Sequence, residues 1–492
     1  MLVTLVACYF AVTICIGFYA ARRVKNSADY LVAGRSLPLY MNTATVFATW
    51  FGAELILAVS STFLKEGLQG VVGDPFGAAF CLIFVALFLA APYYRLKLMT
   101  VGDFYKRRYN RTVELASAAA ISISYLGWSS ANLVALGIVI HTVSGNAITL
   151  EQGIVLGAVI VGVYTLFGGM WSVAFTDLFQ TVIIVAGLIY IAWMLAGMAG
   201  GVDKVVATAQ ASDRLKFFPG ASLHDWLGFI AAFVTMALGS VAQQDVFQRV
   251  TSARTEKIAR QGTLLGGSLY LLMAFIPMFI AVSALLIDPA MVKQMLSNEN
   301  DFQQVLPTLI LQRTPLFAQV LFFGALLSAI LSTASGTLLA PTAVITENVI
   351  QPLWGHKLSD RKMLVLLRLI LIGFTCCVTL FALQSESSMY QMVQDAYKVT
   401  LVAAFTPLVF GMFWRRATPQ GALLSMFCGV VAWQYAEHFM SDALVPPQLV
   451  GLGSAIVGMI VGSLAPTLLG GQGHPEIVDL ARQPEVADNP PA

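Results

Sequence analysis

The chain has 492 residues, of which 58% are apolar and only 11% carry a charge, whereas an ordinary soluble domain has about 25% charged residues. Such a chain has too little polar surface to cover a water-soluble globule, so the composition excludes a soluble enzyme, a nucleic-acid-binding protein and a secreted disulfide scaffold. A helix that crosses the bilayer core needs roughly 20 apolar residues, and the apolar content is enough for about a dozen crossings. We therefore expect an all-α polytopic membrane protein in contact with a lipid bilayer.

The apolar segments are separated by short polar loops and predict thirteen membrane-spanning helices. The first segment has no basic residues before it and is followed by Arg22 and Arg23, which is typical of a retained helix rather than of a signal peptide. The residues 471–492 are polar and rich in proline, and we expect them to form a disordered tail. In chain order, the thirteen segments lie near residues 2–21, 38–62, 69–92, 113–143, 150–169, 172–199, 222–249, 261–287, 306–344, 362–383, 388–414, 419–438 and 447–470.

Basic residues are distributed unevenly over the loops between these segments. The loops near 22–35, 95–111, 249–260, 357–368 and 415–416, together with the tail, hold 21 of the 28 Lys and Arg residues, and the opposite loops hold six. Loops rich in Lys and Arg stay on the cytoplasmic side. The bias predicts a multi-pass protein of the cell (inner or plasma) membrane, with its N-terminus outside and its C-terminus in the cytoplasm.

Two of the spans are interrupted near mid-membrane by glycine and polar residues. They read TATVFATWFGAELILA (Thr43–Ala58) and MALGSVAQQDVFQR (Met236–Arg249), and they lie five spans apart, so they enter the membrane in opposite directions. Paired broken helices in two inverted halves are typical of a transporter binding site. The alternative is that Gly52 and Gly239 only allow close packing of helices.

Six ionisable residues fall inside the spans, where a charge is costly and indicates function. Asp395 and Lys398 are three residues apart on one helix and are expected to neutralise each other. Glu54 and Asp74 have no basic residue at helical spacing, which favours a direct role. Asp177 is close to the start of its span and is expected to line a water-filled cytoplasmic cavity. The sixth is Asp245.

Ala329, Ser332 and Thr333 are spaced so that they share one face of a helix. A monovalent cation needs several oxygens in place of its hydration shell, and two hydroxyls together with carbonyls from an unwound helix supply them. The alternative is that these hydroxyls bond to carbonyls of their own helix or to a neighbouring helix.

Six short segments in this chain follow one another in a family-specific order: SADYLVAGRSLP (Ser27–Pro38), TVGDFYKRRYN (Thr100–Asn110), YTLFGGMWSVAFTDLFQT (Tyr164–Thr181), QQDVFQRVTSA (Gln243–Ala253), AILSTASGTLL (Ala329–Leu339) and FGMFWRRATPQGAL (Phe410–Leu423). In these segments the chain resembles the sodium/solute symporter family, and the likeness spans nearly its whole length. The resemblance implies a LeuT-type core of two inverted five-helix repeats, expected over 38–414. An additional helix and loop (1–37) would precede this core, and two helices (415–470) and the tail (471–492) would follow it.

The resemblance also implies a site for a coupling sodium ion. It would use the backbone carbonyls of Ala48 and Phe51 in the first broken helix, the carbonyl of Ala329, and the hydroxyls of Ser332 and Thr333. Asp177 matches an aspartate that the family places along the sodium exit route.

For the solute, the segment around Trp50 is more similar to the choline transporter branch than to the sugar or proline branches. Trp50 matches an aromatic that this branch places against a quaternary ammonium, and Trp128 is a candidate second wall. Where that branch has a further tryptophan, this chain has Gln243, so the aromatic cage is incomplete. The remaining candidate substrate contacts are Glu54, Asp74, Gln244 and Gln394.

These observations predict sodium-coupled symport of a small organic solute by alternating access. An amino acid or other amine-bearing zwitterion is the expected substrate, and a quaternary ammonium such as choline is the alternative. A solute-sensing membrane receptor without useful flux is a rival, and proton coupling through Asp177 or Glu54 stays open. The chain has no HExxH motif, Ser/His pair or Cys nucleophile context that would indicate an enzyme. We expect no nucleic-acid partner, and a monomer or weak homo-oligomer.

Overall fold

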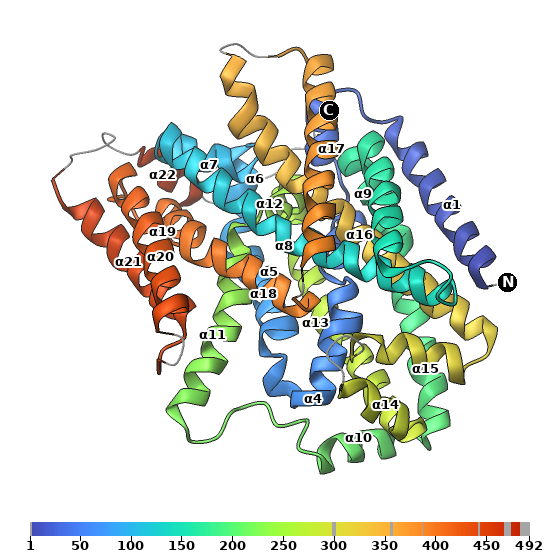
Figure 1. Ribbon diagram of the computed structural model, residues 1–492. Coiled ribbons are helices and arrows are strands. Elements are labelled where there is room, and N and C mark those ends of the chain that lie inside the picture. The colour runs from blue at the N-terminus through green and yellow to red at the C-terminus, as the bar shows by residue number, and fades with distance from the viewer. Residues whose placement is uncertain are drawn as a thin grey trace.

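The computed structural model describes residues 2–297, 302–354, 358–385, 387–440, 443–466 and 474–482. Helices account for the regular structure of these residues (Figure 1), apart from one isolated bridge between Leu37 and Ala253. The helices of 17 or more residues are α1 (Leu2–Ala21), α8 (Arg111–Val143), α9 (Leu150–Ala199), α11 (Leu223–Gly239), α13 (Glu256–Ile287), α16 (Leu316–Val344), α17 (Asp360–Gln384), α20 (Pro419–Phe439) and α21 (Pro447–Leu464). The expected all-α polytopic class is confirmed.

Shorter helices complete the spans or lie between them. α3 (Leu39–Trp50) and α4 (Ser60–Gly70) form one bent span. A second span, Val72–Leu96, contains α5 (Ala78–Phe84) and α6 (Ala90–Leu96), and a third, Met389–Phe413, contains α18 (Met389–Thr400) and α19 (Thr406–Phe413). The remaining α-helices are α2 (Ser27–Val32), α7 (Val101–Arg108), α10 (Val202–Ala211), α12 (Gln244–Thr251), α14 (Pro289–Leu296), α15 (Val305–Arg313) and α22 (Glu476–Arg482).

Among the described residues, ten helices are long and apolar enough to cross a membrane, and the bent pair α3–α4 makes eleven. The other two of the thirteen expected spans correspond to Leu150–Val163, which is a shorter apolar helix, and to α20, which is not among the ten. The count of thirteen is therefore not confirmed.

Two of the expected spans are joined in α9, which has no loop between them. Gly169 has φ 50° and ψ −148° there, a conformation in which a side chain would be strained. A Cβ on Gly169 would lie 2.4 Å from the Tyr30 carbonyl oxygen. The chain therefore turns at a glycine and packs tightly against α2, and no polar loop marks the turn in the sequence.

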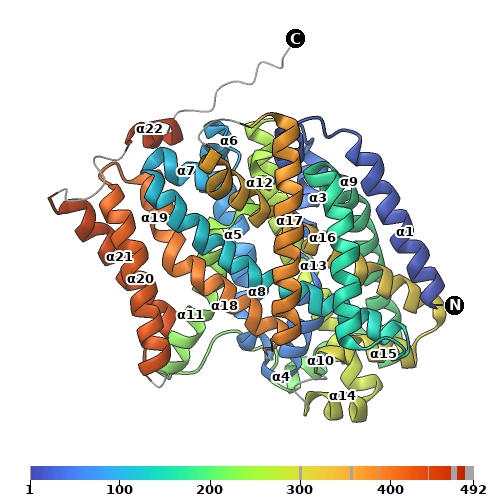
Figure 2. The ribbon, with the colours of Figure 1, turned by 45° about the horizontal axis from the view of Figure 1, so that its top comes forward.

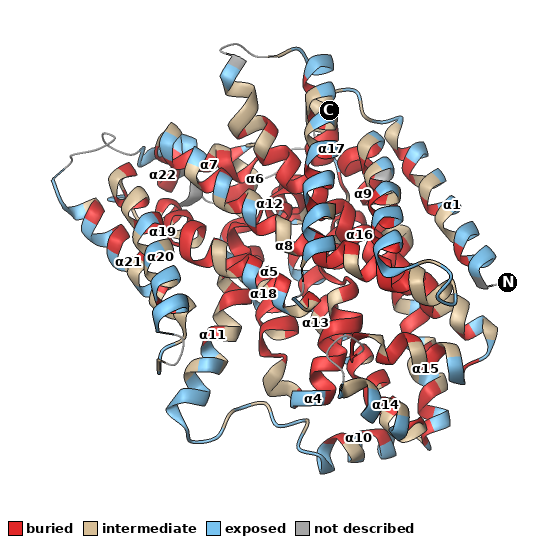
Figure 3. Ribbon diagram, in the orientation of Figure 1, coloured by how far each residue is buried: buried red, intermediate tan, exposed pale blue. Residues whose placement is uncertain are grey.

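α16 runs through the middle of the molecule and is surrounded by α9, α8, α3 and α1. All its residues from Phe322 to Val344 are buried, as the red colour in Figure 3 shows. The hydroxyl and small residues of α16 are therefore enclosed by protein and do not face lipid. A polar group placed there must find partners inside the protein.

The loops that were expected on the cytoplasmic side meet at one end of the molecule. Leu37 donates to Ser252 and accepts from Arg254 through the backbone, at 3.0 and 2.9 Å. Arg95 pairs with Glu256 at 2.5 Å. Figure 2 shows α6, α7, α12 and α22 at this end, and α10 and α14 at the other.

The expected disordered tail contains the short helix α22, which differs from the prediction. Ile477 and Val478 of α22 are buried, and the helix packs on α6 and α19. Asp479 pairs with Arg415, and the His474 amide donates to the Arg108 carbonyl at 3.0 Å. Two adjacent apolar residues therefore dock this part of the polar tail, and residues 467–473 and 483–492 lie outside the described residues.

Candidate functional site

The first expected interruption is present at the end of α3. Phe51 has ψ 72°, which ends the α-helix, and the chain resumes as a π-helical segment over Glu54–Val59 that continues into α4. The two halves are bent by 52°. Gly52 lies at the break, where a Cβ would be 2.7 Å from the Thr333 hydroxyl oxygen. The glycine therefore allows α16 to approach the broken backbone, so close packing and helix interruption occur together.

The second expected interruption is present between α11 and α12. A 3₁₀ turn over Ser240–Ala242 follows α11, and Gln243 is extended, with φ −75° and ψ 142°. α12 then begins at Gln244. Both interrupted spans thus leave main-chain groups outside regular α-helix, and such backbone at membrane depth is tolerated where protein or a polar cavity surrounds it.

The hydroxyl pair of α16 faces the first break. The Thr333 hydroxyl lies 3.0 Å from the Ala329 carbonyl oxygen and 3.4 Å from that of Ala48. Ser332 donates to Asp177 Oδ1 of α9 at 2.5 Å, and Asp177 Oδ2 has no hydrogen-bond partner among the described residues. Each of these five residues is at most 2% exposed.

The oxygens at this junction come from three helices: α3, α9 and α16. Phe51, whose carbonyl was also expected to bind sodium, is fully buried at the end of α3, beside Gly52. Carbonyl, hydroxyl and carboxylate oxygens suit a hard cation. The residues expected for sodium therefore converge, and the donor set fits such an ion.

Arg249 also belongs to this region, although its place at the end of a predicted span had assigned it to a cytoplasmic loop. Its side chain is instead 2% exposed, and its Nε donates to the Thr49 hydroxyl at 2.9 Å. A Cβ on Gly336 would lie 2.6 Å from Arg249 Nη2. The available signal was the spacing of Asp245 and Arg249, four residues apart, which places both on one face of a helix.

The indole of Trp50 lies within a cluster of aromatic rings. Its ring centroid is 5.8 Å from that of Trp128, 6.2 Å from that of Tyr397 and 6.5 Å from that of Tyr270. Trp128 is also 5.5 Å from Tyr397. Trp50 and Trp128 were expected here, whereas Tyr270 and Tyr397 were not, because their proximity depends on how α13 and α18 pack against α3.

Two acidic groups border this aromatic cluster. Asp74 accepts a hydrogen bond from the Tyr270 hydroxyl, and Glu54 Oε1 has no hydrogen-bond partner among the described residues. The segment Glu54–Val59 packs on α13 and α18, the helices that carry Tyr270 and Tyr397. Gln394, one turn before Tyr397, has an amide nitrogen that is buried and likewise unpartnered. The cluster thus combines aromatic faces with acidic and amide groups.

The two neighbouring glutamines at the second break have different surroundings. Gln243 Nε2 donates to Ser124 at 3.0 Å and lies 3.3 Å from the Thr400 hydroxyl, next to the helices that carry Trp128 and Tyr397. Gln244 instead accepts from the Val101 amide at 2.7 Å and donates to the Met99 carbonyl at 3.3 Å. The structure therefore brings Gln243 near the aromatic cluster, whereas the side chain of Gln244 is bonded to the backbone at the start of α7.

The other three ionisable residues predicted inside the spans are Asp245, Asp395 and Lys398, and each has an ion-pair or hydrogen-bond partner. Asp395 and Lys398 form an ion pair at 2.9 Å, as their spacing predicted, and Lys398 is also 3.6 Å from Glu437. Asp245 accepts from the Tyr125 hydroxyl, and its backbone amide lies 2.9 Å from the same oxygen.

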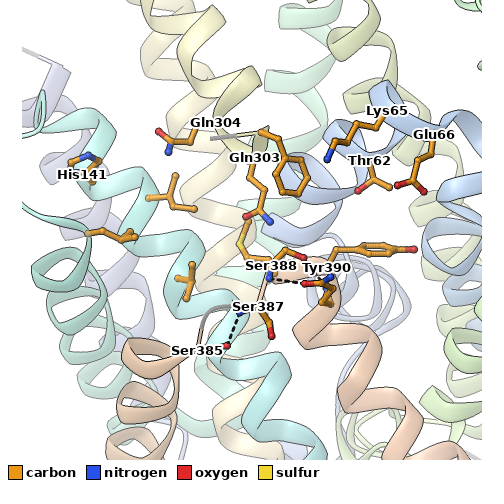
Figure 4. Close-up of a pocket in the computed structure, with 16 residues that line it drawn as sticks. Thr62, Lys65, Glu66, His141, Gln303, Gln304, Ser385, Ser387, Ser388 and Tyr390 are labelled. Atoms are coloured by element: carbon orange, nitrogen blue, oxygen red, sulfur yellow. Dashed lines mark hydrogen bonds between the residues drawn. The ribbon is translucent and has the colours of Figure 1, made fainter. Parts of the chain in front are cut away.

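A cavity of about 690 Å³ lies at the α10 and α14 end of the molecule (Figure 4). Thr62 of α4, Ile138 of α8 and Tyr390 of α18 are part of its lining. The same three helical spans carry Glu54, Trp128 and Tyr397 deeper in the protein. Among the described residues, the lining of the cavity does not include Trp50, Trp128, Tyr270 or Tyr397. Its position fits a vestibule that is separated from the cluster by side chains.

The family model and the relatives that match this chain agree with each other. The model of the sodium:solute symporter family matches residues 30–429. The high-affinity proline transporter PutP of Bacillus subtilis (strain 168) is 26% identical over 444 residues, which cover 87% of this chain and 91% of the relative. The high affinity choline transporter 1 of Homo sapiens is 23% identical over 437 residues, which cover 86% of this chain and 74% of the relative.

Solved structures with the same fold include the substrate-bound outward-open state of a Na⁺-coupled sialic acid symporter. It has a TM-score of 0.80 at 18% identity and covers 96% of this chain and 98% of its own. The nucleobase-cation-symport-1 family transporter Mhp1 has a TM-score of 0.60 at 13% identity, with 88% and 93% coverage. At these identities the likeness concerns the fold, which is that of LeuT-like transporters.

Proposed function

The chain belongs to the sodium:solute symporter family, and from this premise we propose that it takes up a small amine-bearing solute by alternating access, driven by sodium bound between α3 and α16. It is a membrane transporter that couples solute movement to sodium, and not an enzyme. The proposed sodium ligands are the carbonyls of Ala48, Phe51 and Ala329 and the hydroxyls of Ser332 and Thr333, with Asp177 on the exit route.

The observation that carries this proposal is the contact of the Thr333 hydroxyl with both Ala48 and Ala329. These two carbonyls belong to different helices, and one of the helices is broken three residues further on. An ion at this point would tie the broken helix to α16. Because sodium would then favour one arrangement of the two helices, sodium and solute affinities would be linked reciprocally.

For the solute, we propose that the aromatic cluster and Glu54 bind an amine. A cation is attracted to the face of an aromatic ring, and Glu54 and Asp74 add negative charge. A zwitterion is the leading substrate because the unpartnered amide of Gln394 is a donor for a carboxylate. A quaternary ammonium is the second candidate, because four aromatic rings converge at Trp50. Relatives of both kinds, proline and choline transporters, are similar to this chain.

We further propose the topology expected from the sequence: thirteen spans, of which ten form two inverted five-helix repeats, with the N-terminus outside and the C-terminus in the cytoplasm. The meeting of the basic loops at one end of the molecule supports this orientation. In this arrangement the cavity lined by Thr62 and Tyr390 faces outward. A monomer or weak homo-oligomer is proposed as the assembly.

The sodium site is tested with sodium alone. In detergent at constant ionic strength, replacing potassium by sodium is expected to raise the melting temperature of the wild type, since an ion that binds only the folded state stabilises it. The double variant Ser332→Ala/Thr333→Ala is expected to lose this shift. Thr342→Ala is the control, because its buried hydroxyl donates to the Leu338 carbonyl of its own helix and to no other group in the described part of the chain. A sodium shift that persists in the double variant contradicts the site.

Transport is distinguished from sensing by a second measurement. Solutes that raise the melting temperature in sodium are offered to proteoliposomes with a sodium gradient, and proline and choline serve as the first probes. Accumulation that requires the gradient is expected of a symporter. Binding without accumulation would indicate a receptor instead.

A further inference from the structure

A fixed positive charge lies about one helical turn from the proposed sodium site. Arg249 of α12 reaches between Thr49 of α3 and Gly336 of α16. Thr49 follows Ala48 directly, and Gly336 comes three residues after Thr333. The guanidinium thus touches the same two helices that supply the proposed sodium ligands.

The guanidinium of Arg249 is only partly hydrogen-bonded. Nε donates to Thr49, but neither Nη1 nor Nη2 has a hydrogen-bond partner among the described residues, although the side chain is 2% exposed. Buried donors without acceptors are unfavourable. Such a group is expected to have an alternative position in which these N–H groups are satisfied.

The complementary acceptor is Asp177. Its Oδ1 accepts from Ser332, while Oδ2 is buried and unpartnered in the described part of the chain. Asp177 contacts Ser332, and Arg249 lies against Gly336, one turn later on the same helix, yet the two groups do not form one of the ion pairs within 4.0 Å found among the described residues. A cationic donor and an anionic acceptor are therefore close but not joined.

We propose that Arg249 is a tethered substitute for sodium: when the ion leaves, the guanidinium moves from Thr49 to Asp177 and neutralises it. This inference rests on the proposed sodium site. With sodium present, the ion offsets the charge of Asp177, and Thr49 holds Arg249 away. Without sodium, the buried carboxylate of Asp177 would lack a compensating positive charge, which is unfavourable. The Arg249–Asp177 pair supplies that charge, so the carrier can change conformation with neither ion nor solute bound.

The small residue at position 336 fits this movement. A side chain there would meet Nη2, so Gly336 leaves the space in which the guanidinium lies. The backbone of Arg249 is fixed, because its carbonyl accepts from Asn42 Nδ2 at 2.7 Å. The end of the side chain can therefore move while α12 stays in place.

Asp245 is the competing partner for Arg249. It lies one turn earlier on α12, and its Oδ2 is also without a hydrogen-bond partner among the described residues. Asp245 differs from Asp177 in its partner. It accepts a hydrogen bond from the Tyr125 hydroxyl, whereas Asp177 accepts one from Ser332 of the hydroxyl pair. If Arg249 served only as the counter-ion of Asp245, it would not compete with sodium.

Two variants with opposite expected effects test the proposal, with sodium affinity measured by sodium-dependent thermal shift. Arg249→Gln removes the competitor, so sodium is expected to bind about threefold or more tightly. Thr49→Val keeps every charge but removes the acceptor that holds Arg249, so sodium is expected to bind more weakly. Because the second variant leaves the net charge unchanged, it separates competition from a general electrostatic effect. Arg254→Gln, an exposed position near the same end of α12, is the control and is expected to bind sodium as the wild type does.

The partner is identified by repeating Arg249→Gln in two backgrounds. In Asp177→Asn the tightening is expected to disappear, and in Asp245→Asn it is expected to persist. Weaker or unchanged sodium binding in Arg249→Gln overturns the proposal, as does unchanged binding in Thr49→Val. If Arg249→Gln does not fold, Thr49→Val alone decides. Failure of the sodium site itself can be told apart from failure of the Arg249 proposal. If the site is wrong, Ser332→Ala/Thr333→Ala keeps the sodium-dependent rise in melting temperature that the wild type shows.

Discussion

At the scale of single residues, Trp50 has the surroundings expected of a ligand-binding aromatic. It is the last residue of α3, directly before the break, and three further rings approach it from α8, α13 and α18. Its side chain is 7% exposed, so it is shielded from lipid and does not belong to an interfacial belt. The break fixes the position of the indole, and we expect the neighbouring acids to determine the sign of the charge that the proposed pocket can accommodate.

We expect Trp50→Ala to weaken binding of an amine solute by about tenfold or more, because a desolvated cation–π contact contributes roughly 2 kcal/mol. The measurement is the solute concentration that gives half of the maximal thermal shift in sodium. Trp193→Ala is the matched control, since Trp193 is 73% exposed on the outer surface of α9. Equal solute binding by Trp50→Ala and the wild type would show that the aromatic cluster is not the pocket.

At the scale of the elements, the break in the first core helix and the hydroxyl pair of α16 form one structural unit. The break ends α3 at Phe51, and Gly52 lets Thr333 come within reach of Ala48. We expect neither feature to make a cation site by itself, because a continuous α3 would use its carbonyls internally, and α16 alone would offer two hydroxyls and the Ala329 carbonyl. We therefore expect the distance between the two helices to control the affinity for sodium.

We expect Gly52→Ala to weaken sodium binding more than it lowers stability in potassium. The added Cβ would lie 2.7 Å from the Thr333 hydroxyl oxygen and 3.3 Å from the Thr333 Cβ. Such overpacking typically costs about 1–3 kcal/mol, and here the strain falls on a proposed ligand. Melting temperatures in sodium and in potassium separate the two effects. Gly373→Ala in α17 is the control, because a Cβ there would meet nothing within 4 Å. A full sodium shift in Gly52→Ala would argue against the close approach.

At the scale of the whole molecule, α22 joins two segments that are far apart in the chain. It packs on α6 and α19, which belong to two different spans and follow π-helical segments at Val85–Leu89 and Leu401–Phe405. Single-turn π segments are places where a helix can bend. The docked helix therefore holds together two helix ends that lie next to potential hinges.

We expect Val478→Asp to detach α22, since Val478 is fully buried and an unpaired carboxylate in its place would be strongly unfavourable. Hydrogen exchange of residues 474–482 should become fast, while exchange in α16 should stay slow. Glu476→Gln is the control, because Glu476 is exposed. Continued protection of α22 in Val478→Asp would show that the docking does not depend on this side chain.

The class of the protein and the position of its broken helices were predictable from the sequence. Apolar composition determines that the chain lies in a bilayer, and the interruption at Phe51–Ala53 is a local property of the residues there. The helical face shared by Ala329, Ser332 and Thr333 follows from 3.6-residue periodicity alone. For the same reason, Asp395 and Lys398 were correctly paired.

Only the tertiary structure decided which distant residues meet. Gln244 has the same residue type as its neighbour Gln243, yet the turn into α12 directs it to Met99 and Val101. Tyr270 and Tyr397 reach Trp50 because three helices pack together, and Arg249 is enclosed because α12 lies against α16. Hydropathy and spacing describe each helix separately, whereas these contacts depend on the distances and rotations between helices, which no single segment encodes.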